Sequence, residues 1–269
     1  SRKGDCAKSC GHARVGHGGK VGTAAGESSL AGWDAGQLAM GQIELHCAAF
    51  NLWPAGQHPS WPPKMSRFNA AFYRRFYVDP RTRVTTAAQM KARARTIAML
   101  VRHLDIPVKR ILDAGCGLGL MRKPLLREFP GSTYLGVEVS EHLCERYGWK
   151  RGSLDAFTAP GQFDLIVCYD VLQYMEDRRA SAAIANLARL SRGAFYFHAP
   201  TLEDWRRNAD RSCSDGDIHL REAAWYRKRL ERYFRYAGFG LHVRRGIPFV
   251  QWELEKAFSI DSDFRRNDE

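Results

Sequence analysis

The chain has 269 residues and a formal net charge of +12; 45% of its residues are hydrophobic and 26% are charged. This length suits one large domain or two small ones, and the composition is that of an ordinary globular protein. No apolar run approaches the roughly 18 residues of a membrane span, and the first residues lack the apolar core of a secretory signal. The basic charge fits nucleic acid, an acidic membrane or an anionic substrate, and does not choose among them.

The cysteines are odd in number and show no paired spacing, so we expect reduced thiols and a cytoplasmic location. They are Cys6, Cys10, Cys47, Cys116, Cys144, Cys168 and Cys213. Cys6, Cys10, His12 and His17 match no common zinc spacing, so we predict no metal site.

Residues 1–64 differ from the rest of the chain. They hold 11 of the 24 glycines and show no sustained helical or strand period. We therefore predict a disordered N-terminal extension over residues 1–64 and one folded domain over residues 65–269.

In the folded part, aromatic residues first recur at a spacing of three to four, which predicts an amphipathic helix that Pro80 ends. These residues are Phe68, Phe72, Tyr73, Phe76 and Tyr77. A second helix is expected over residues 86–104, with Met90, Ile97, Leu100 and Val101 on one face. A short apolar strand at residues 110–113 then runs into a glycine turn.

Strand-like runs follow at residues 134–138, 163–168 and 194–198, with helices between them, for example at residues 179–190. Strands that alternate with helices predict a parallel sheet covered on both faces. After residue 220 we expect a long helix to about residue 236. Residues 241–245 and 249–255 then read as a closing antiparallel pair.

The strongest motif is the glycine turn after the first strand. Asp113 ends the strand, and Gly115, Gly117 and Gly119 follow at every second position. Glycine allows a sharp turn and close approach of a ligand to the backbone. The third glycine comes one place earlier than in the dinucleotide fingerprint, and Asp113 would repel a phosphate, so the motif favours a ligand with a cationic group.

Glu138 ends the next strand, 25 residues after Asp113. A carboxylate at this place can accept both hydroxyl groups of a ribose, as an acid does in dinucleotide-binding folds.

The stretches Asp113-Ala-Gly-Cys-Gly-Leu-Gly119, Glu138 and Phe163–Met175 together resemble the class I S-adenosylmethionine-dependent methyltransferases, over about residues 110–257. The resemblance implies a Rossmann-like seven-stranded α/β sheet of order 3-2-1-4-5-7-6, with the last strand antiparallel and helices on both faces. It implies S-adenosylmethionine as cofactor and S-adenosylhomocysteine as product. The implied cofactor-binding residues are Asp113, Gly115, Cys116, Gly117, Gly119, Glu138, Leu154, Asp155 and Tyr169. Asp155 would hold the adenine amine, and Leu154 would face its ring.

Two absences restrict the substrate. The Asn/Asp-Pro-Pro-Tyr/Phe signature of methyltransferases that act on exocyclic amino groups of DNA and on protein glutamine is missing after residue 168. The Pro-Cys nucleophile needed for methylation of cytosine C5 does not occur either. We therefore predict a methyltransferase for the O or N nucleophile of a small molecule. Two alternatives stay open. The basic residues between positions 227 and 235, expected on one helix, leave room for an RNA methyltransferase, and the lack of an unambiguous general base leaves room for a non-catalytic cofactor-binding subunit. The sequence does not predict the oligomeric state.

Substrate-side residues are expected at the carboxyl ends of the later strands. His198 ends the strand at residues 194–198 and is the candidate general base. The segment Tyr73–Arg81, residues 169–174 and the long loop 201–219, with Asp204 and Trp205, are expected to choose the substrate.

Removal of residues 1–64 is expected to leave the melting temperature almost unchanged, because this segment has no periodic apolar face to bury. Thermal unfolding of the full chain and of residues 65–269 measures the difference. A drop of more than a few degrees in the shorter chain would show that the extension packs on the domain.

Overall fold

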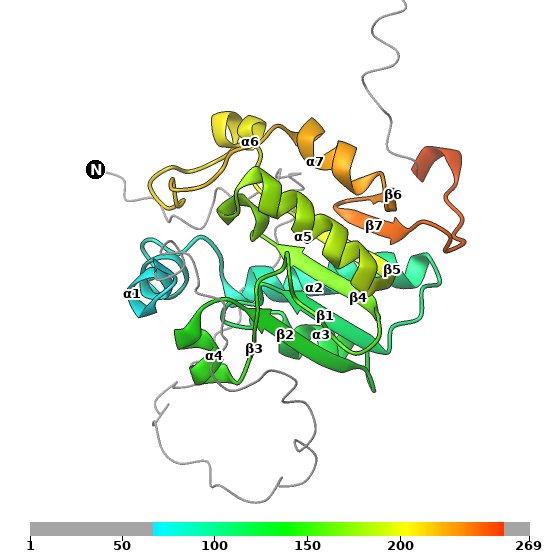
Figure 1. Cartoon of the computed structure of the whole chain (residues 1–269), viewed down its shortest axis with the longest axis horizontal. Coiled ribbons are helices and arrows are strands. Elements are labelled where there is room, and N and C mark those ends of the chain that lie inside the picture. Colours follow the sequence, from blue (N-terminus) through cyan, green and yellow to red (C-terminus); the bar gives the residue numbers. More distant parts are fainter. Residues whose placement is uncertain (1–66, 256–269) are drawn as a thin grey trace, which may run out of the picture. The chain divides into compact units, whose positions relative to one another are not determined.

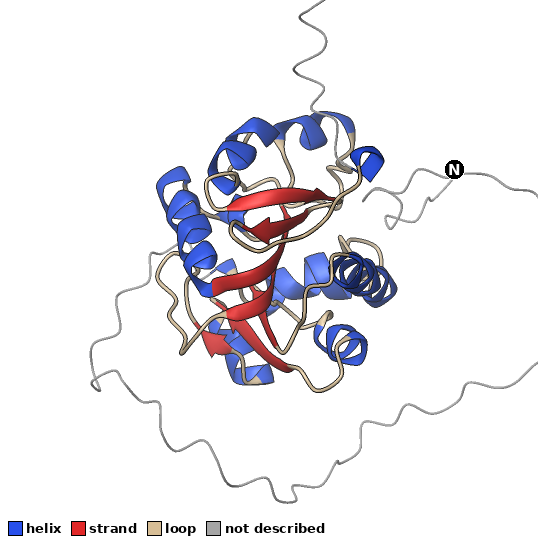
Figure 2. Cartoon of the chain, turned by 90° about the vertical axis from the view of Figure 1, so that its right-hand side faces the viewer, coloured by secondary structure: helices blue, strands red, loops and turns tan. Residues whose placement is uncertain are grey.

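The computed structural model describes residues 67–255 (Figures 1 and 2). The predictions of a disordered extension and of no metal at Cys6–His17 fall outside these residues. Within residues 67–255, no three His, Cys, Asp or Glu side chains are grouped so that they could hold a metal ion.

Seven strands form one sheet in the order β3-β2-β1-β4-β5-β7-β6, which confirms the order that the resemblance implies. The strands are β1 Arg110–Ala114, β2 Thr133–Glu138, β3 Lys150–Arg151, β4 Phe163–Tyr169, β5 Ser191–His198, β6 Phe234–Gly238 and β7 Leu241–Arg244. β1 to β5 are parallel, and β7 is antiparallel to both β5 and β6. The central strands β1 and β4 are buried over nearly their whole length, in keeping with their mostly apolar sequences.

Helices cover both faces of the sheet (Figure 2). One face packs against α2 Ala87–His103 and α3 Arg122–Glu128, and the other against α5 Asp177–Leu190 and α7 Ala223–Leu230. α4 Glu141–Tyr147 follows β2, and α6 Leu202–Arg207 follows β5. α2 begins at a capping box in which Gln89 N donates to Thr86 Oγ1 and Thr86 N donates to Gln89 Oε1.

The first aromatic segment is helical as predicted, but in two pieces. α1 Ala70–Tyr73 continues into a π-helical turn, Arg74–Val78, and the helix ends before Pro80. We call residues 67–78 the cover segment. Ser140 Oγ, just after β2, donates a hydrogen bond to Phe68 O at 2.6 Å, which ties the cover segment to the carboxyl edge of the sheet.

Two predictions near the C-terminus are wrong. The helix after residue 220 ends at Leu230, and the closing antiparallel pair is β6 with β7, not residues 241–245 with 249–255. Gly238, Phe239 and Gly240 all have left-handed φ values, of 101°, 50° and 81°, and they make the tight turn between the two strands. In residues 249–255, the apolar side chains of Val250, Trp252 and Leu254 are exposed, so their alternation does not reflect a sheet face.

Cys116, Cys144 and Cys168 are free thiols, whereas Cys213 is disulfide-bonded, so the expectation of reduced thiols throughout is wrong at Cys213. Burial raises the pKa of Cys168 above its ordinary value, in keeping with an inert core thiol. Across residues 67–255, none of the helices has the length and apolar character needed to cross a membrane. The cytoplasmic location stays a prediction.

Candidate cofactor and substrate site

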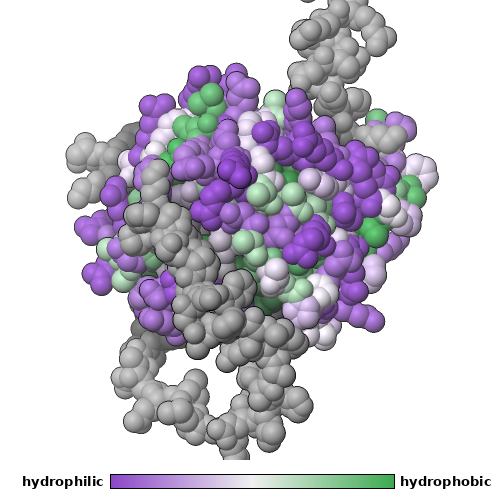
Figure 3. Space-filling view, viewed as in Figure 1, coloured by the Kyte–Doolittle hydropathy of each residue, from purple (hydrophilic) through white to green (hydrophobic). Residues whose placement is uncertain are grey.

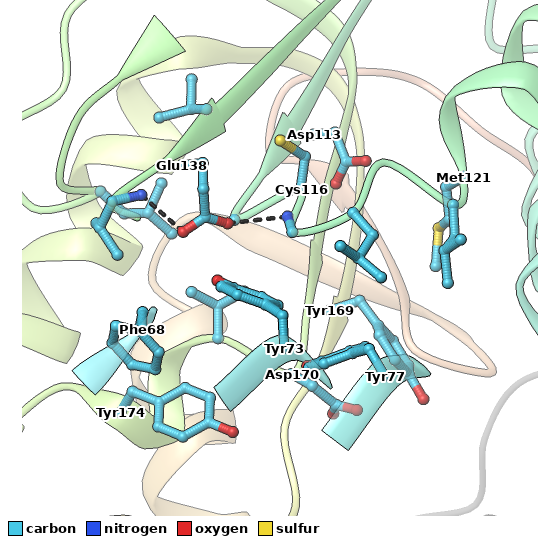
Figure 4. A pocket seen from close by; sticks show the side chains of 18 of the residues that line it. Phe68, Tyr73, Tyr77, Asp113, Cys116, Met121, Glu138, Tyr169, Asp170 and Tyr174 are labelled. Atoms are coloured by element: carbon cyan, nitrogen blue, oxygen red, sulfur yellow. Dashed lines mark hydrogen bonds between the residues drawn. The ribbon is translucent and has the colours of Figure 1, made fainter. Parts of the chain in front are cut away.

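A cavity lies at the carboxyl ends of β1, β2 and β4, beneath the cover segment (Figure 4). Its wall contains the glycine loop after β1, the carboxylates of Asp113 and Glu138, residues 152–154 after β3, residues 169–171 after β4, and aromatic rings of the cover segment. Adjacent parallel strands place these segments, distant in sequence, at one edge of the sheet.

The three glycines of the loop have different tasks. A Cβ on Gly115 would lie 2.4 Å from Val171, and a Cβ on Gly119 would lie 2.4 Å from the ring of Trp149. A Cβ on Gly117 would meet no atom within 4 Å, although its φ of 51° is left-handed. Gly115 and Gly119 thus allow close packing within the protein, and Gly117 leaves space beside the cavity. Trp149, which sequence reasoning missed, also donates from Nε1 to Gly117 O at 2.9 Å.

Glu138 is buried, and hydrogen bonds hold its carboxylate in one orientation (Figure 4). Oε1 accepts from the amides of Val139 and Ser140 at 2.7 and 3.0 Å, and Oε2 accepts from the amide of Gly117 at 2.8 Å. The Tyr73 hydroxyl lies close enough to help lower the pKa of Glu138. Burial raises the pKa of Glu138, while these hydrogen bonds oppose the rise. The acid at the end of β2 is therefore preorganised toward the glycine loop.

Asp113 is also buried, and its Oδ2 accepts a hydrogen bond from the Tyr134 hydroxyl at 2.5 Å. The pKa of Asp113 is raised to about 6: burial is the main cause, the Tyr134 hydrogen bond opposes it, and the nearby Glu138 charge adds to it. Within residues 67–255, Asp113 makes no ion pair with a Lys, Arg or His side chain. A buried carboxylate without a cationic partner is best stabilised by a positively charged ligand.

The predicted adenine residues lie in different places. Leu154 and its neighbour Ser153 line the cavity, as does Tyr169. The Asp155 side chain is not in the cavity wall; its oxygens bind Arg179 Nε and Nη2 at 2.8 and 3.0 Å, and Ser153 Oγ. Asp155 thus holds the Arg179 side chain beside the cavity, and its binding to adenine stays a prediction.

His198 lies at the end of β5, but its ring is not part of the cavity wall. It stacks on Tyr169 at 4.9 Å between centroids, and its Nδ1 lies 2.6 Å from Oδ1 of Asp170. Asp170 itself does line the cavity. Burial lowers the pKa of His198, but Asp170 reverses the shift and leaves the pKa raised. The group that faces the cavity is therefore the carboxylate of Asp170, which sequence reasoning did not single out.

The sequence of this chain is similar to those of known proteins. Residues 112–193 match the family described as Methyltransferase domain. The match confirms the predicted resemblance to the class I S-adenosylmethionine-dependent methyltransferase superfamily. The chain is 28% identical over 185 residues to trans-aconitate 2-methyltransferase of Pseudomonas paraeruginosa, covering 65% of this chain and 60% of that protein.

Magnesium-protoporphyrin O-methyltransferase of Synechocystis sp. is 29% identical to this chain over 107 residues, covering 35% of this chain and 46% of that protein. The solved structure of magnesium protoporphyrin IX methyltransferase from Synechocystis with bound S-adenosylhomocysteine aligns with a TM-score of 0.46 and 22% identity. That alignment covers 67% of this chain and 97% of that one. The chain spans roughly half to three fifths of the length of the two curated relatives.

The cofactor of the superfamily is S-adenosylmethionine, and the cavity fits its chemistry at three points. Asp113 is a buried carboxylate that lacks a cationic partner among the described residues. Gly117 leaves open space where a side chain would stand. Leu154 gives an apolar surface on the side of residues 152–154. The site therefore offers a charge partner, room beside the backbone and an apolar surface in one cavity.

The cover segment contributes a network of aromatic rings to the cavity. Centroid distances between neighbouring rings are 5.1 to 6.3 Å. The pairs are Phe68 with Phe72 and Tyr174, and Phe72 with Tyr73 and Tyr174. Tyr77 joins them at 5.7 Å from Tyr73. The predicted participation of Tyr73 and Tyr77 is consistent with this placement.

Other predicted substrate-side residues lie away from the cavity. Arg81 is exposed and pairs with Asp79 at 3.1 Å. Asp204 caps α6 by accepting from the amide and hydroxyl of Thr201, and neither Asp204 nor Trp205 is in the cavity wall. Their expected role in choosing the substrate has no support from their positions.

Two alanine substitutions should separate the tasks of the glycines. Gly119→Ala is expected to lower the free energy of unfolding by about 1 kcal/mol for its left-handed backbone, and by about 1–3 kcal/mol more for the clash with Trp149. Gly117→Ala should show only the smaller loss in stability but a weaker affinity for S-adenosylmethionine. Denaturant unfolding and calorimetry measure the two effects. Equal losses of stability would contradict the assignment.

Proposed function

We propose that this chain transfers the methyl group of S-adenosylmethionine to an O or N nucleophile of a small molecule. The observation that carries the proposal is the pair of buried carboxylates, Asp113 and Glu138, at the ends of adjacent strands on either side of the glycine loop. The cytoplasmic location is part of the proposal.

The chain's own residues would bind and orient the cofactor. Asp113 would attract the cationic methionine end, and Glu138 would accept a hydrogen bond from the ribose while keeping its three backbone donors. Leu154 would pack against the adenine ring. When bound, S-adenosylmethionine supplies a methyl group on a positively charged sulfur, so alignment and exclusion of water are the main catalytic demands on the protein.

A small substrate is favoured over RNA by the aromatic cover. Phe68, Phe72 and Tyr73 close the cavity from the side of the cover segment, so a ligand must fit beneath them. The basic residues near position 230 line no part of this cavity and do not share one helix, because Arg235 lies on β6. Arg229 lies 3.5 Å from the ring of Trp225, and Arg235 lies 4.1 Å from that of Phe249.

Hydrophilic side chains gather over α5, α6 and α7 on the face that Figure 3 shows. A solvated helix face accounts for the basic residues there without RNA. The named relatives support the same choice, since trans-aconitate and magnesium protoporphyrin are small molecules.

The cofactor assignment predicts tight binding of S-adenosylmethionine and S-adenosylhomocysteine and little affinity for NAD. Glu138→Gln should weaken S-adenosylhomocysteine binding by about 1–3 kcal/mol, the scale of a lost hydrogen bond to a charged acceptor. Isothermal calorimetry with each ligand measures both effects, with Glu141→Gln, an exposed acid on α4, as the matched control. Tight binding of NAD without a response to either sulfur ligand would refute the proposal.

The raised pKa of Asp113 predicts a pH dependence of cofactor binding. A cationic ligand favours the ionised carboxylate, so below pH 6 binding must displace a proton. The affinity for S-adenosylmethionine is therefore expected to be highest above pH 6 and to fall by up to about tenfold for each pH unit below it. Calorimetry between about pH 5 and 7 tests this.

Asp113→Asn should remove most of this dependence and weaken binding above pH 6. Any slope that remains in the variant reports Glu138, whose pKa burial also raises. An unchanged slope in Asp113→Asn would show that Asp113 is not the titrating partner of the ligand.

A further inference from the structure

We propose that the side of the cavity formed by Asp170, Tyr77 and Tyr174 binds the ammonium group of a primary or secondary amine, and that this amine is the methyl acceptor. The inference rests on the proposed function, because it names the substrate class of the same site. Figure 4 shows Asp170 and Tyr77 well apart from Asp113, and the charge of Asp170 reaches Tyr77, where it contributes to the raised pKa. The two carboxylates can therefore serve different ligands.

Three polar groups on this side are available to a ligand. Within residues 67–255, the hydroxyls of Tyr77 and Tyr174 make no hydrogen bond, although both residues line the cavity. Burial raises the pKa of both, so they remain neutral hydroxyls. Oδ1 of Asp170 is hydrogen-bonded to Nδ1 of His198, while Oδ2 has no hydrogen-bond partner among the described residues. A ligand here meets a carboxylate oxygen and two hydroxyl oxygens.

The charge around these groups is negative, in a chain that is basic overall. The charged residues in the cavity wall are Asp113, Glu138, Asp170 and Arg179, and Arg179 is already bound by Asp155. Asp215 lies close enough to contribute to the raised pKa of Tyr77 and Tyr174. The nearby cationic groups are engaged by the protein. Arg67 is bound to Asp215 and Asp217, Arg93 donates to Tyr196 Oη, and His198 pairs with Oδ1 of Asp170.

This combination fits an ammonium group better than the alternatives. A carboxylate ligand would be repelled by Asp170, and a hydroxyl ligand offers one donor to three acceptor oxygens. A primary ammonium offers three donors and a positive charge, and aromatic faces of the surrounding rings attract that charge. Each added methyl group keeps the charge and adds apolar surface against those rings.

The bound ammonium loses one proton to the Asp170 carboxylate, and the half-exposed His198 links that carboxylate to water. The freed nitrogen lone pair forms the new C–N bond as the C–S bond breaks, and the C–S electron pair stays on sulfur as a neutral thioether. The methylated nitrogen leaves as an ammonium ion, and one proton is released per turnover.

The test uses three probes that share a ring and a one-carbon frame: benzylamine, benzyl alcohol and benzoate. In each probe a single carbon joins the ring to the polar atoms, so the three differ mainly in the charge and hydrogen-bonding capacity of the polar group. Each is titrated into the full chain saturated with S-adenosylhomocysteine, at about pH 7.5, where benzylamine is protonated. Ligand-detected NMR gives the dissociation constants. We expect benzylamine to bind at least about tenfold more tightly than the other two, on the scale of hydrogen bonds to a charged group.

Asp170→Asn should abolish the preference for benzylamine, and Tyr77→Phe should reduce benzylamine affinity severalfold. Neither variant should change S-adenosylhomocysteine affinity by more than about twofold. Asp105→Asn is the matched control for the first, because Asp105 is exposed and has a similar left-handed φ of 51°, against 56° for Asp170. Tyr147→Phe, outside the cavity wall, is the control for the second.

The inference and the proposed function fail in different ways. If the chain binds no S-adenosylhomocysteine, the proposed function is wrong. If it binds that ligand but prefers benzyl alcohol or benzoate, or binds none of the three probes, the ammonium inference alone is overturned. A preference that survives Asp170→Asn overturns it as well. A large loss of S-adenosylhomocysteine affinity in Tyr77→Phe would assign Tyr77 to the cofactor instead.

Discussion

The site depends on one buried carboxylate that binds backbone amides from two loops. Glu138 accepts from Gly117 in the loop after β1, and from Val139 and Ser140 in the loop after β2. Left unpaired, a buried carboxylate would cost several kcal/mol, so these donors are a condition of its burial. The same carboxylate contacts Tyr73 of the cover segment, and Ser140 holds Phe68 O. Two strand ends and the cover are thus fixed relative to one acid.

Charge is distributed unevenly in this protein. The chain carries a net charge of +12, yet the cavity wall holds three carboxylates and one guanidinium. The basic side chains near the site are engaged: Arg179 by Asp155, and Arg93 by Tyr196 Oη, with its guanidinium 4.2 Å from the Tyr169 ring. The overall charge therefore gives no guide to the ligand, because the field at a buried site is set by the groups that face it.

Much of the fold and of the cofactor side of the site could be predicted from patterns confined to a few neighbouring residues. The mostly apolar strands β1 and β4, and the spacing of Gly115, Gly117 and Gly119, identify the sheet and the glycine loop directly. The predictions failed where the deciding contacts are distant in sequence. The turn at Gly238–Gly240 places β6 where the sequence pattern favoured a helix, and Trp149 fills the space beside Gly119 from 30 positions further along the chain.

Asp170 shows why the substrate side is harder to predict than the cofactor side. No sequence motif marks Asp170. Its position depends on a left-handed backbone conformation just after β4, where its amide donates to His198 O at 3.0 Å. Asp tolerates this conformation better than most residues, but it still has a cost in free energy that the surrounding contacts must offset. Here the pairing with His198 fixes one carboxylate oxygen and the backbone bond fixes the main chain. The other oxygen is thereby held ready at the cavity, next to two tyrosine hydroxyls that no described protein group uses.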